Sequence, residues 1–292
     1  MPVIFERATK LLQEGLPLGS SIIDIQIALK LLGFMPNNYY RQCDGKRGKD
    51  TNTAIKALNW TIFEREEDIT IDYGKITELL LDKEVNWFKV PFVEDPDAGN
   101  IAIFDYLKSK KDWIIDNFNV PYDFIHAILW QETGLKHYDL DGFIFVGCDT
   151  GTPDYKYRSR GWGMGQYTIS NHPPSKKQQK SIVDPIRNIE FTCNHLWLKF
   201  KLYCGKLKIC QYPLSSEKYL RDCKKCVGIS PRATIVLPKA NYHSKAMVGY
   251  KDIPLLDVCG WGLAVERYNG AGQNAIAYKY EVLSKIEGEE IR

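Results

Sequence analysis

The chain has 292 residues, of which 39 are Lys or Arg and 36 are Asp or Glu, so its formal net charge is +3. This balance is too even to indicate a nucleic-acid-binding protein, but it is compatible with an anionic cell wall as partner. The length allows two domains and a sizeable core. No stretch approaches the ~20 apolar residues of a membrane-spanning helix, and the Met1–Arg7 segment lacks the cationic and apolar runs of a signal peptide.

Residues 18–81 are expected to form a small helical module. A first helix should stop at Gly33, a residue suited to end a helix. Its apolar positions recur at helical spacing: Ile22, Ile25, Leu29 and Leu32. Asp44-Gly45 predicts a turn, and Asp50 or Thr51 is placed to cap a further helix that carries Ala54, Ile55 and Leu58.

The order of these signals is similar to that of a known wall-binding module. A helix that ends in Leu-Gly-Phe, followed by Asp-Gly-x-x-Gly-x-x-Thr and a second helix, resembles the three-helix peptidoglycan-binding domain. The family's usual Phe-Gln is replaced by Leu58-Asn59-Trp60 at the end of the second helix. The resemblance implies that residues 1–90 form a peptidoglycan-binding domain up to the start of a linker. A helical packing domain without a ligand is the alternative.

Residues 91–100 are expected to be the linker, because Pro91, Pro96 and Gly99 stand there among acidic residues. The remaining residues, 101–292, would then form a second domain. Its first amphipathic helix is predicted to begin at residue 101 and to extend towards residue 118.

The next predicted helix carries the first candidate for chemistry. Phe124, Ile128 and Glu132 recur at i, i+4 and i+8, so the Glu132 carboxylate shares a face with core residues. Burial raises the pKa of a carboxyl group, and a protonated carboxyl near neutral pH suits a general acid that protonates a poor leaving group such as a glycosidic oxygen. A surface Glu at the end of a helix is the plainer alternative.

A glycine-rich stretch, Gly-Trp-Gly-Met-Gly-Gln at 161–166, suggests backbone that passes close to a ligand, with Gln166 placed to hydrogen-bond it. A strained turn is the alternative. Together with Glu-Thr-Gly at 132–134 and Arg-Tyr-Asn-Gly-Ala-Gly at 267–272, it resembles the lytic transglycosylases and related lysozyme-like muramidases. Those enzymes cut the glycan strands of peptidoglycan.

The resemblance implies roles for individual residues. Glu132 matches the catalytic acid, residues 159–166 match a Ser-x-Gly-x-x-Gly-x-x-Gln signature that is one residue shorter here, and Tyr268-Asn269 match a segment that holds the sugar near the acid. The residues expected to bind the substrate are Ser159, Gly163, Gln166, Tyr167, Tyr268 and Asn269.

Residues 136–157 contain several Asp residues and an expected short hairpin. In phage-type lysozymes the acid is followed by an Asp and a Thr on such a hairpin, and Asp141 and Thr150 lie at suitable separations from Glu132. Asp141 is therefore a candidate second carboxylate for a hydrolytic muramidase. A solvated acidic loop is the alternative, and no regular spacing supports a calcium site.

Four of the eight cysteines cluster in residues 203–232, a stretch expected to be an insertion into the catalytic domain. They are Cys204, Cys210, Cys223 and Cys226. A structural zinc ion, two disulfides and free thiols all remain open for them.

The sequence thus predicts a mainly α fold, with an α+β lysozyme-like catalytic domain behind a three-helix domain. The expected activity is lytic transglycosylase cleavage between N-acetylmuramic acid and N-acetylglucosamine, without a cofactor. Hydrolysis, chitin cleavage and non-catalytic wall binding are the alternatives. We expect a monomer that is made in the cytoplasm and reaches the periplasm or cell wall through phage holins or a secretion apparatus. An immunity protein is a further candidate partner.

Overall fold

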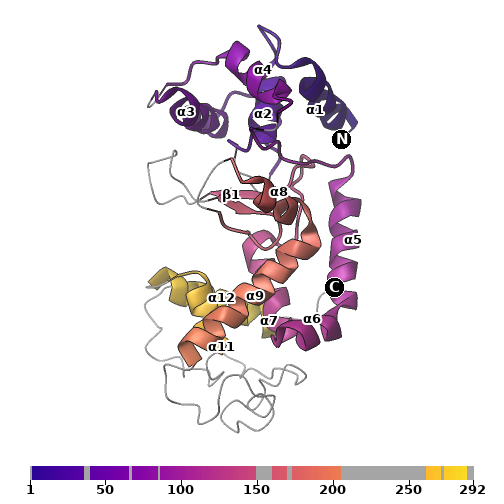
Figure 1. The fold of residues 1–292 in the computed structure, drawn as a ribbon, viewed down its shortest axis with the longest axis vertical. Helices are drawn as coiled ribbons and strands as arrows, with labels where there is room; N and C mark the ends of the chain where they lie inside the picture. Colours follow the sequence, from indigo (N-terminus) through magenta and orange to yellow (C-terminus); the bar gives the residue numbers. More distant parts are fainter. Residues whose placement is uncertain are drawn as a thin grey trace. The chain divides into compact units, whose positions relative to one another are not determined.

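The computed structural model describes residues 2–35, 40–65, 68–84, 86–148, 160–169, 173–204, 261–270 and 273–287. These residues are mainly helical, which confirms the mainly α part of the predicted fold (Figure 1). The chain divides into two compact units. The first unit contains residues 1–105 and 136–188, and the second contains residues 106–135 and 189–292.

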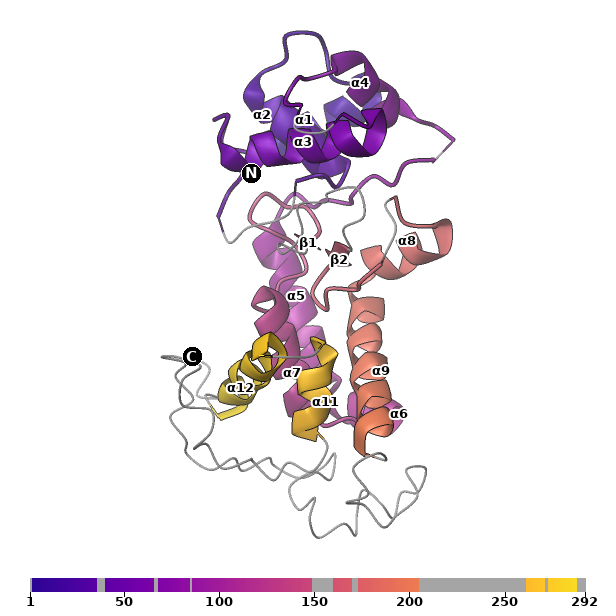
Figure 2. The same cartoon turned by 90° about the vertical axis from the view of Figure 1, so that its left-hand side faces the viewer.

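The first unit begins with four helices, which lie together in both Figure 1 and Figure 2. They are α1 (Pro2–Glu14), α2 (Ile22–Leu31), α3 (Lys49–Phe63) and α4 (Tyr73–Leu81). Helix α2 ends before Gly33, whose φ is +72°, as its sequence predicts. At the start of α3 the predicted caps are wrong: Gly48 is the N-cap, and Asp50 and Thr51 lie within the helix. Both have other partners, because Asp50 accepts a hydrogen bond from Tyr40 and Thr51 accepts one from Gln26.

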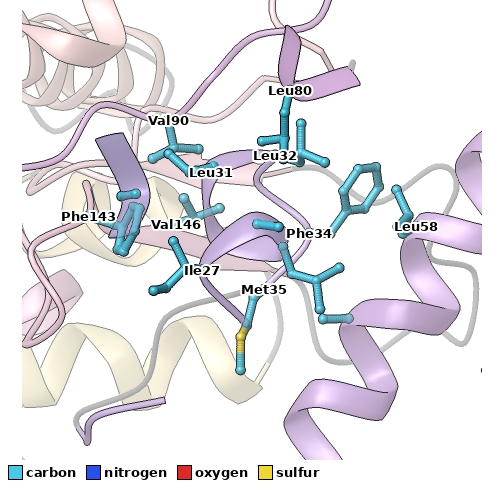
Figure 3. Close-up of a cluster of buried hydrophobic side chains, with 14 of the residues drawn as sticks. Ile27, Leu31, Leu32, Phe34, Met35, Leu58, Leu80, Val90, Phe143 and Val146 are labelled. Atoms are coloured by element: carbon cyan, nitrogen blue, oxygen red, sulfur yellow. The ribbon is translucent and has the colours of Figure 1, made fainter. Parts of the chain in front are cut away.

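A single apolar core joins these helices to residues much later in the chain. Ile27 and Leu31 of α2 lie in one buried cluster with Phe143 and Val146 (Figure 3). The indole N–H of Trp87 donates to the Leu32 carbonyl at 3.1 Å. The N-terminal helices and the segment after residue 136 therefore share their hydrophobic stabilisation.

The predicted linker differs from the structure. Residues 91–93 run beside residues 142–144, where the Val93 amide donates to Gly142 and the Ile144 amide donates to Pro91. Gly142 has a φ of +93°, and a Cβ there would collide with the Val93 carbonyl. Helix α5 (Pro96–Ser109) begins inside the predicted linker, because a proline that interrupts a helix is well tolerated in its first turn.

The rest of the first unit is a small sheet and a short helix. Strands β1 (Val146–Cys148) and β2 (Arg160–Trp162) pair antiparallel, with Gly147 opposite Gly161. Helix α8 (Lys176–Val183) opens with a capping box formed by Ser175 and Gln178.

The second unit is helical in its described residues. It contains the end of α5 and the helices α6 (Lys111–Phe118), α7 (Tyr122–Thr133), α11 (Trp261–Tyr268) and α12 (Gln273–Glu287), with most of α9 (Pro185–Cys204). Figure 1 and Figure 2 both show α12 beside α7 and α11. Trp261 lies at the centre of an aromatic cluster, with ring centroids 4.0 Å from Phe200 and 6.0 Å from Phe124.

Among the residues that the structure describes, none of the helices combines the length and the apolar composition that crossing a membrane requires.

Candidate active site

Glu132 lies in the last turn of α7, which packs closely against α12 in the second unit. The predicted spacing is reproduced, since Phe124 and Ile128 on the same helix are fully buried while Glu132 keeps partial exposure. Helix α7 ends at Gly134, whose φ of +65° suits the left-handed turn that stops the helix directly after the acid. The carboxylate is thus held at a helix end, on a residue that is partly buried.

Among the described residues, the Glu132 carboxylate has one hydrogen-bond donor from the last helix. The hydroxyl of Tyr278, on α12, donates to Glu132 Oε1 at 2.5 Å. Burial raises the pKa of Glu132 to about 7, and the hydrogen bond from Tyr278 opposes this shift. The pKa of Glu132 therefore lies close to neutral pH, which suits a group that both gives and accepts a proton.

Two tyrosines stand on the side of α11 and α12 that faces Glu132. The rings of Tyr268 and Tyr278 stack with centroids 6.3 Å apart and planes 10° from parallel. Burial and the nearby Glu132 carboxylate both raise the pKa of each phenol. Both hydroxyls therefore remain protonated at neutral pH and serve as hydrogen-bond donors.

Of the predicted pair Tyr268-Asn269, the tyrosine lies near the acid. Tyr268 ends α11, and the Glu132 carboxylate contributes to raising the pKa of its phenol, while Asn269 follows as an exposed residue. On its other side Tyr268 contacts the ring of His195 from α9, with centroids 4.8 Å apart. Burial, with the nearby Lys199, lowers the pKa of His195 to about 4, so this imidazole is neutral at pH 7.

The glycine-rich turn is built around a side chain of the protein and not around an open backbone surface. Gln166 donates from Nε2 to the Gly163 carbonyl at 2.8 Å. A Cβ at Gly147 or Gly161 would collide with the Gln166 amide, which lies over this pair of opposed glycines. The expectation that the glycines make room for a ligand is therefore wrong for Gly161, because the space beside it is filled by Gln166.

The turn itself is closed by backbone hydrogen bonds. The Trp162 amide donates to the Tyr167 carbonyl at 3.1 Å, and the Tyr167 amide donates to the Trp162 carbonyl at 2.9 Å. Gly163 has a φ of +66°, and a Cβ there would lie 2.6 Å from the His137 ring. Gln166 and Tyr167 keep partial exposure, whereas Gly163 is buried and has a packing role.

Asp141 belongs to a buried cluster of charged groups in the first unit. Lys30 of α2 forms ion pairs with Asp139 and, at 3.2 Å, with Asp141, and each of these side chains is at most 2% exposed. Asp141 Oδ2 also accepts hydrogen bonds from the amides of Gln42 and Cys43, at 2.9 and 3.2 Å. A carboxylate with these partners and 1% exposure has no open side from which to activate a water molecule.

In this cluster the positive charge of Lys30 compensates buried negative charge. Burial raises the pKa of Asp139, and Lys30 opposes that shift. Burial by itself would lower the pKa of Lys30, but Asp139, Cys43 and Asp141 together outweigh it and raise that pKa. The ammonium group is therefore charged in the folded protein and compensates buried negative charge.

Several predicted residues lie outside the described part of the chain. They are Thr150, Ser159, Cys210, Cys223 and Cys226. Cys204 is the last residue of α9, and its side chain is not among those described. Within the described residues, no group of three or more His, Cys, Asp or Glu side chains is arranged to hold a metal ion.

Sequence reasoning missed Tyr278 and Lys30. Nothing in the spacing of Tyr278 points to Glu132, which is 146 residues away. Lys30 stands between Leu29 and Leu31 in an apolar helix, and this position was the one available signal.

Comparison of the chain with models of known protein families, with curated proteins and with solved structures finds no match.

Proposed function

We propose that the protein cleaves the glycan strands of peptidoglycan between N-acetylmuramic acid and N-acetylglucosamine, as a lytic transglycosylase with Glu132 as general acid and base. The observation that carries the proposal is the raised pKa of Glu132 together with its hydrogen bond from Tyr278. A partly exposed carboxyl whose pKa is raised to about 7, with a phenol donor at 2.5 Å, is suited to transfer a proton in both directions near neutral pH.

In the proposed reaction, protonated Glu132 gives its proton to the bridging oxygen while the bond from that oxygen to the muramic C1 breaks. An oxocarbenium-like transition state forms on the muramic ring. The Glu132 carboxylate, stabilised by the Tyr278 hydroxyl, then takes the proton of the muramic 6-hydroxyl as its oxygen bonds to C1. The product carries a 1,6-anhydro ring, and Glu132 is again protonated.

Transglycosylation is favoured over hydrolysis by the surroundings of Asp141. A hydrolase needs a second carboxylate that faces the substrate, as nucleophile or as base for water. Asp141 is buried, paired with Lys30 and bonded to two backbone amides. The intramolecular hydroxyl requires no second carboxylate.

The N-terminal helices support a second part of the proposal. We infer that residues 1–90 contribute wall binding, on the basis of their resemblance to peptidoglycan-binding domains, and that peptidoglycan is the partner of the whole chain. Release through phage holins or injection by a secretion apparatus would bring the protein to the wall.

The test is digestion of purified cell walls, followed by mass spectrometry of the released muropeptides. Wild-type protein should lower the turbidity of the walls and release anhydro ends, which are one water lighter than reducing ends. Glu132→Gln keeps the shape of the side chain but has no acidic proton, so activity should fall by at least ~10²-fold. The matched control is Glu78→Gln, which changes a carboxylate that is 68% exposed on α4.

Reducing ends would identify a muramidase instead. Wall binding without turbidity loss by the folded wild-type protein would identify a non-catalytic wall-binding protein.

A further inference from the structure

Directly beside the Glu132–Tyr278 pair, a second polar contact joins α7 to α12. The Gln131 side chain donates from Nε2 to Glu281 Oε2 at 2.6 Å, and its Oε1 accepts from the Lys285 ammonium. Gln131 is the residue before Glu132, and Glu281 and Lys285 follow Tyr278 by three and seven positions. Gln131, Glu281 and Lys285 are partly buried. Because Glu281 and Lys285 are four positions apart, they lie on the same face of α12, and the Gln131 amide bridges this anion and cation.

The geometry of the Glu132–Tyr278 hydrogen bond depends strictly on the register of these two helices. A helix rises about 1.5 Å per residue, so a slide of α12 by one residue would move the Tyr278 hydroxyl by a similar distance. Such a slide would lengthen the 2.5 Å contact with Glu132 and tilt it away from a straight line, and hydrogen bonds weaken steeply when the angle at the hydrogen falls below about 120°.

Apolar packing contributes to this interface, since Val282 and Leu283 bury their side chains on α12. The hydrophobic effect is itself non-directional, so the polar contacts add direction to that packing. The Gln131 bridge is directional at both ends, because its amide N–H and its carbonyl have partners of opposite charge that lie one helical turn apart.

We propose that Gln131 is a positioning residue: by bridging Glu281 and Lys285 it sets the register of α12 on α7 and holds the Tyr278 hydroxyl on the Glu132 carboxylate. The catalytic meaning of this role rests on the proposed function, whereas the positioning itself does not. The titratable groups around this contact are Tyr268 from α11, Glu281 beside Tyr278, Lys285 on Gln131, and His195 and Cys193 beside Tyr268.

The experiment is an NMR titration of the Glu132 side-chain carboxyl carbon in the full-length protein without substrate. Since the Tyr278 hydrogen bond stabilises the carboxylate form, its loss should raise the midpoint. Tyr278→Phe should raise it by about one pH unit, the size of one hydrogen bond to a charged group. Gln131→Leu should raise it by a similar amount, and the double variant should raise it no further than either single variant.

A charge-swapped pair tests the bridge by rescue. Gln131→Glu by itself places two carboxylates against each other, whereas Gln131→Glu with Glu281→Gln restores a donor, an acceptor and the original net charge. The pair should lower the midpoint from that of Gln131→Glu towards that of the wild type. Lys285→Met serves as a second disruption if Gln131→Leu does not fold.

The outcomes separate the two proposals. A wild-type midpoint in folded Gln131→Leu and folded Lys285→Met would overturn the positioning role, whatever the activity. Shifted midpoints together with no cleavage of cell walls by the wild type would leave the positioning role intact and reject the proposed reaction.

Discussion

Replacing Lys30 by Met should be among the most destabilising single changes in the first unit. The substitution removes the ammonium that faces Asp139 and Asp141 but keeps a side chain of similar length, so little cavity forms. Two carboxylates, each at most 2% exposed, then lack their cation. Breaking a buried ion pair on one side costs about 3 to 5 kcal/mol, a large share of the roughly 5 to 15 kcal/mol that stabilises a typical domain.

The pH dependence gives this prediction a sign. The pKa of Asp139 is raised in the folded protein, so its protonation favours folding below the unfolded pKa and this contribution is lost as pH rises through the folded pKa. Without Lys30, the main influence that lowers the Asp139 pKa disappears, so the stability that is lost as pH rises becomes larger. Lys30→Met should therefore be closer to wild type at pH 4.5 than at pH 7.5.

The assay is urea unfolding at both pH values, followed by circular dichroism and Trp fluorescence. Lys10→Met, which removes a Lys that is 68% exposed in a surface pair, should change the free energy of unfolding by less than ~0.5 kcal/mol. A Lys30→Met protein within about 1 kcal/mol of wild type at pH 7.5 would refute the argument, because one kcal/mol is well below the cost of an uncompensated buried charge.

Three further changes test other parts of the structure. Wall cleavage should fall as pH rises through about 7, because Glu132 must be protonated to act as an acid and burial raises its pKa to about 7; a pH–rate profile that stays flat to pH 9 would contradict this. Deleting residues 1–90 should leave the rest of the first unit unfolded or insoluble, since it removes Lys30 and the core shared with Phe143; a soluble product with native hydrogen-exchange protection at residues 143–146 would show the opposite. Gly161→Ala should cost about 1 to 3 kcal/mol by crowding the Gln166 side chain, and the added change Gln166→Ala should recover part of that loss in thermal melts.

The local features of the chain were predictable from short-range patterns. The face shared by Phe124, Ile128 and Glu132 follows from helical spacing, and burial of that face is what raises the pKa of Glu132. The end of α2 at Gly33 follows from the ease with which glycine adopts a positive φ. These properties depend on residues within one or two turns of each other, so the sequence specifies them directly.

The partners of the charged groups came only from the tertiary structure. Asp139 and Asp141 stand in a stretch that resembles a solvated acidic loop, yet Lys30, 109 residues away from Asp139, makes their burial possible. In the same way, proline and acidic residues at 91–100 suggest a linker, whereas the backbone of residues 91–93 is paired with residues 142–144. The composition of a segment indicates whether it would be solvated in isolation. Polar groups that find partners elsewhere in the chain can be buried instead.

For the candidate acid, too, the sequence determined its position and the tertiary structure determined its partners. Helical periodicity places Glu132 on a half-buried face, a property of α7 by itself. The hydroxyl that meets its carboxylate comes from Tyr278, and the register that brings the two together depends on side chains of α12 such as Glu281. A one-dimensional pattern carries no information about which distant helix packs on that face, because packing is selected by the combined shape and polarity of both surfaces.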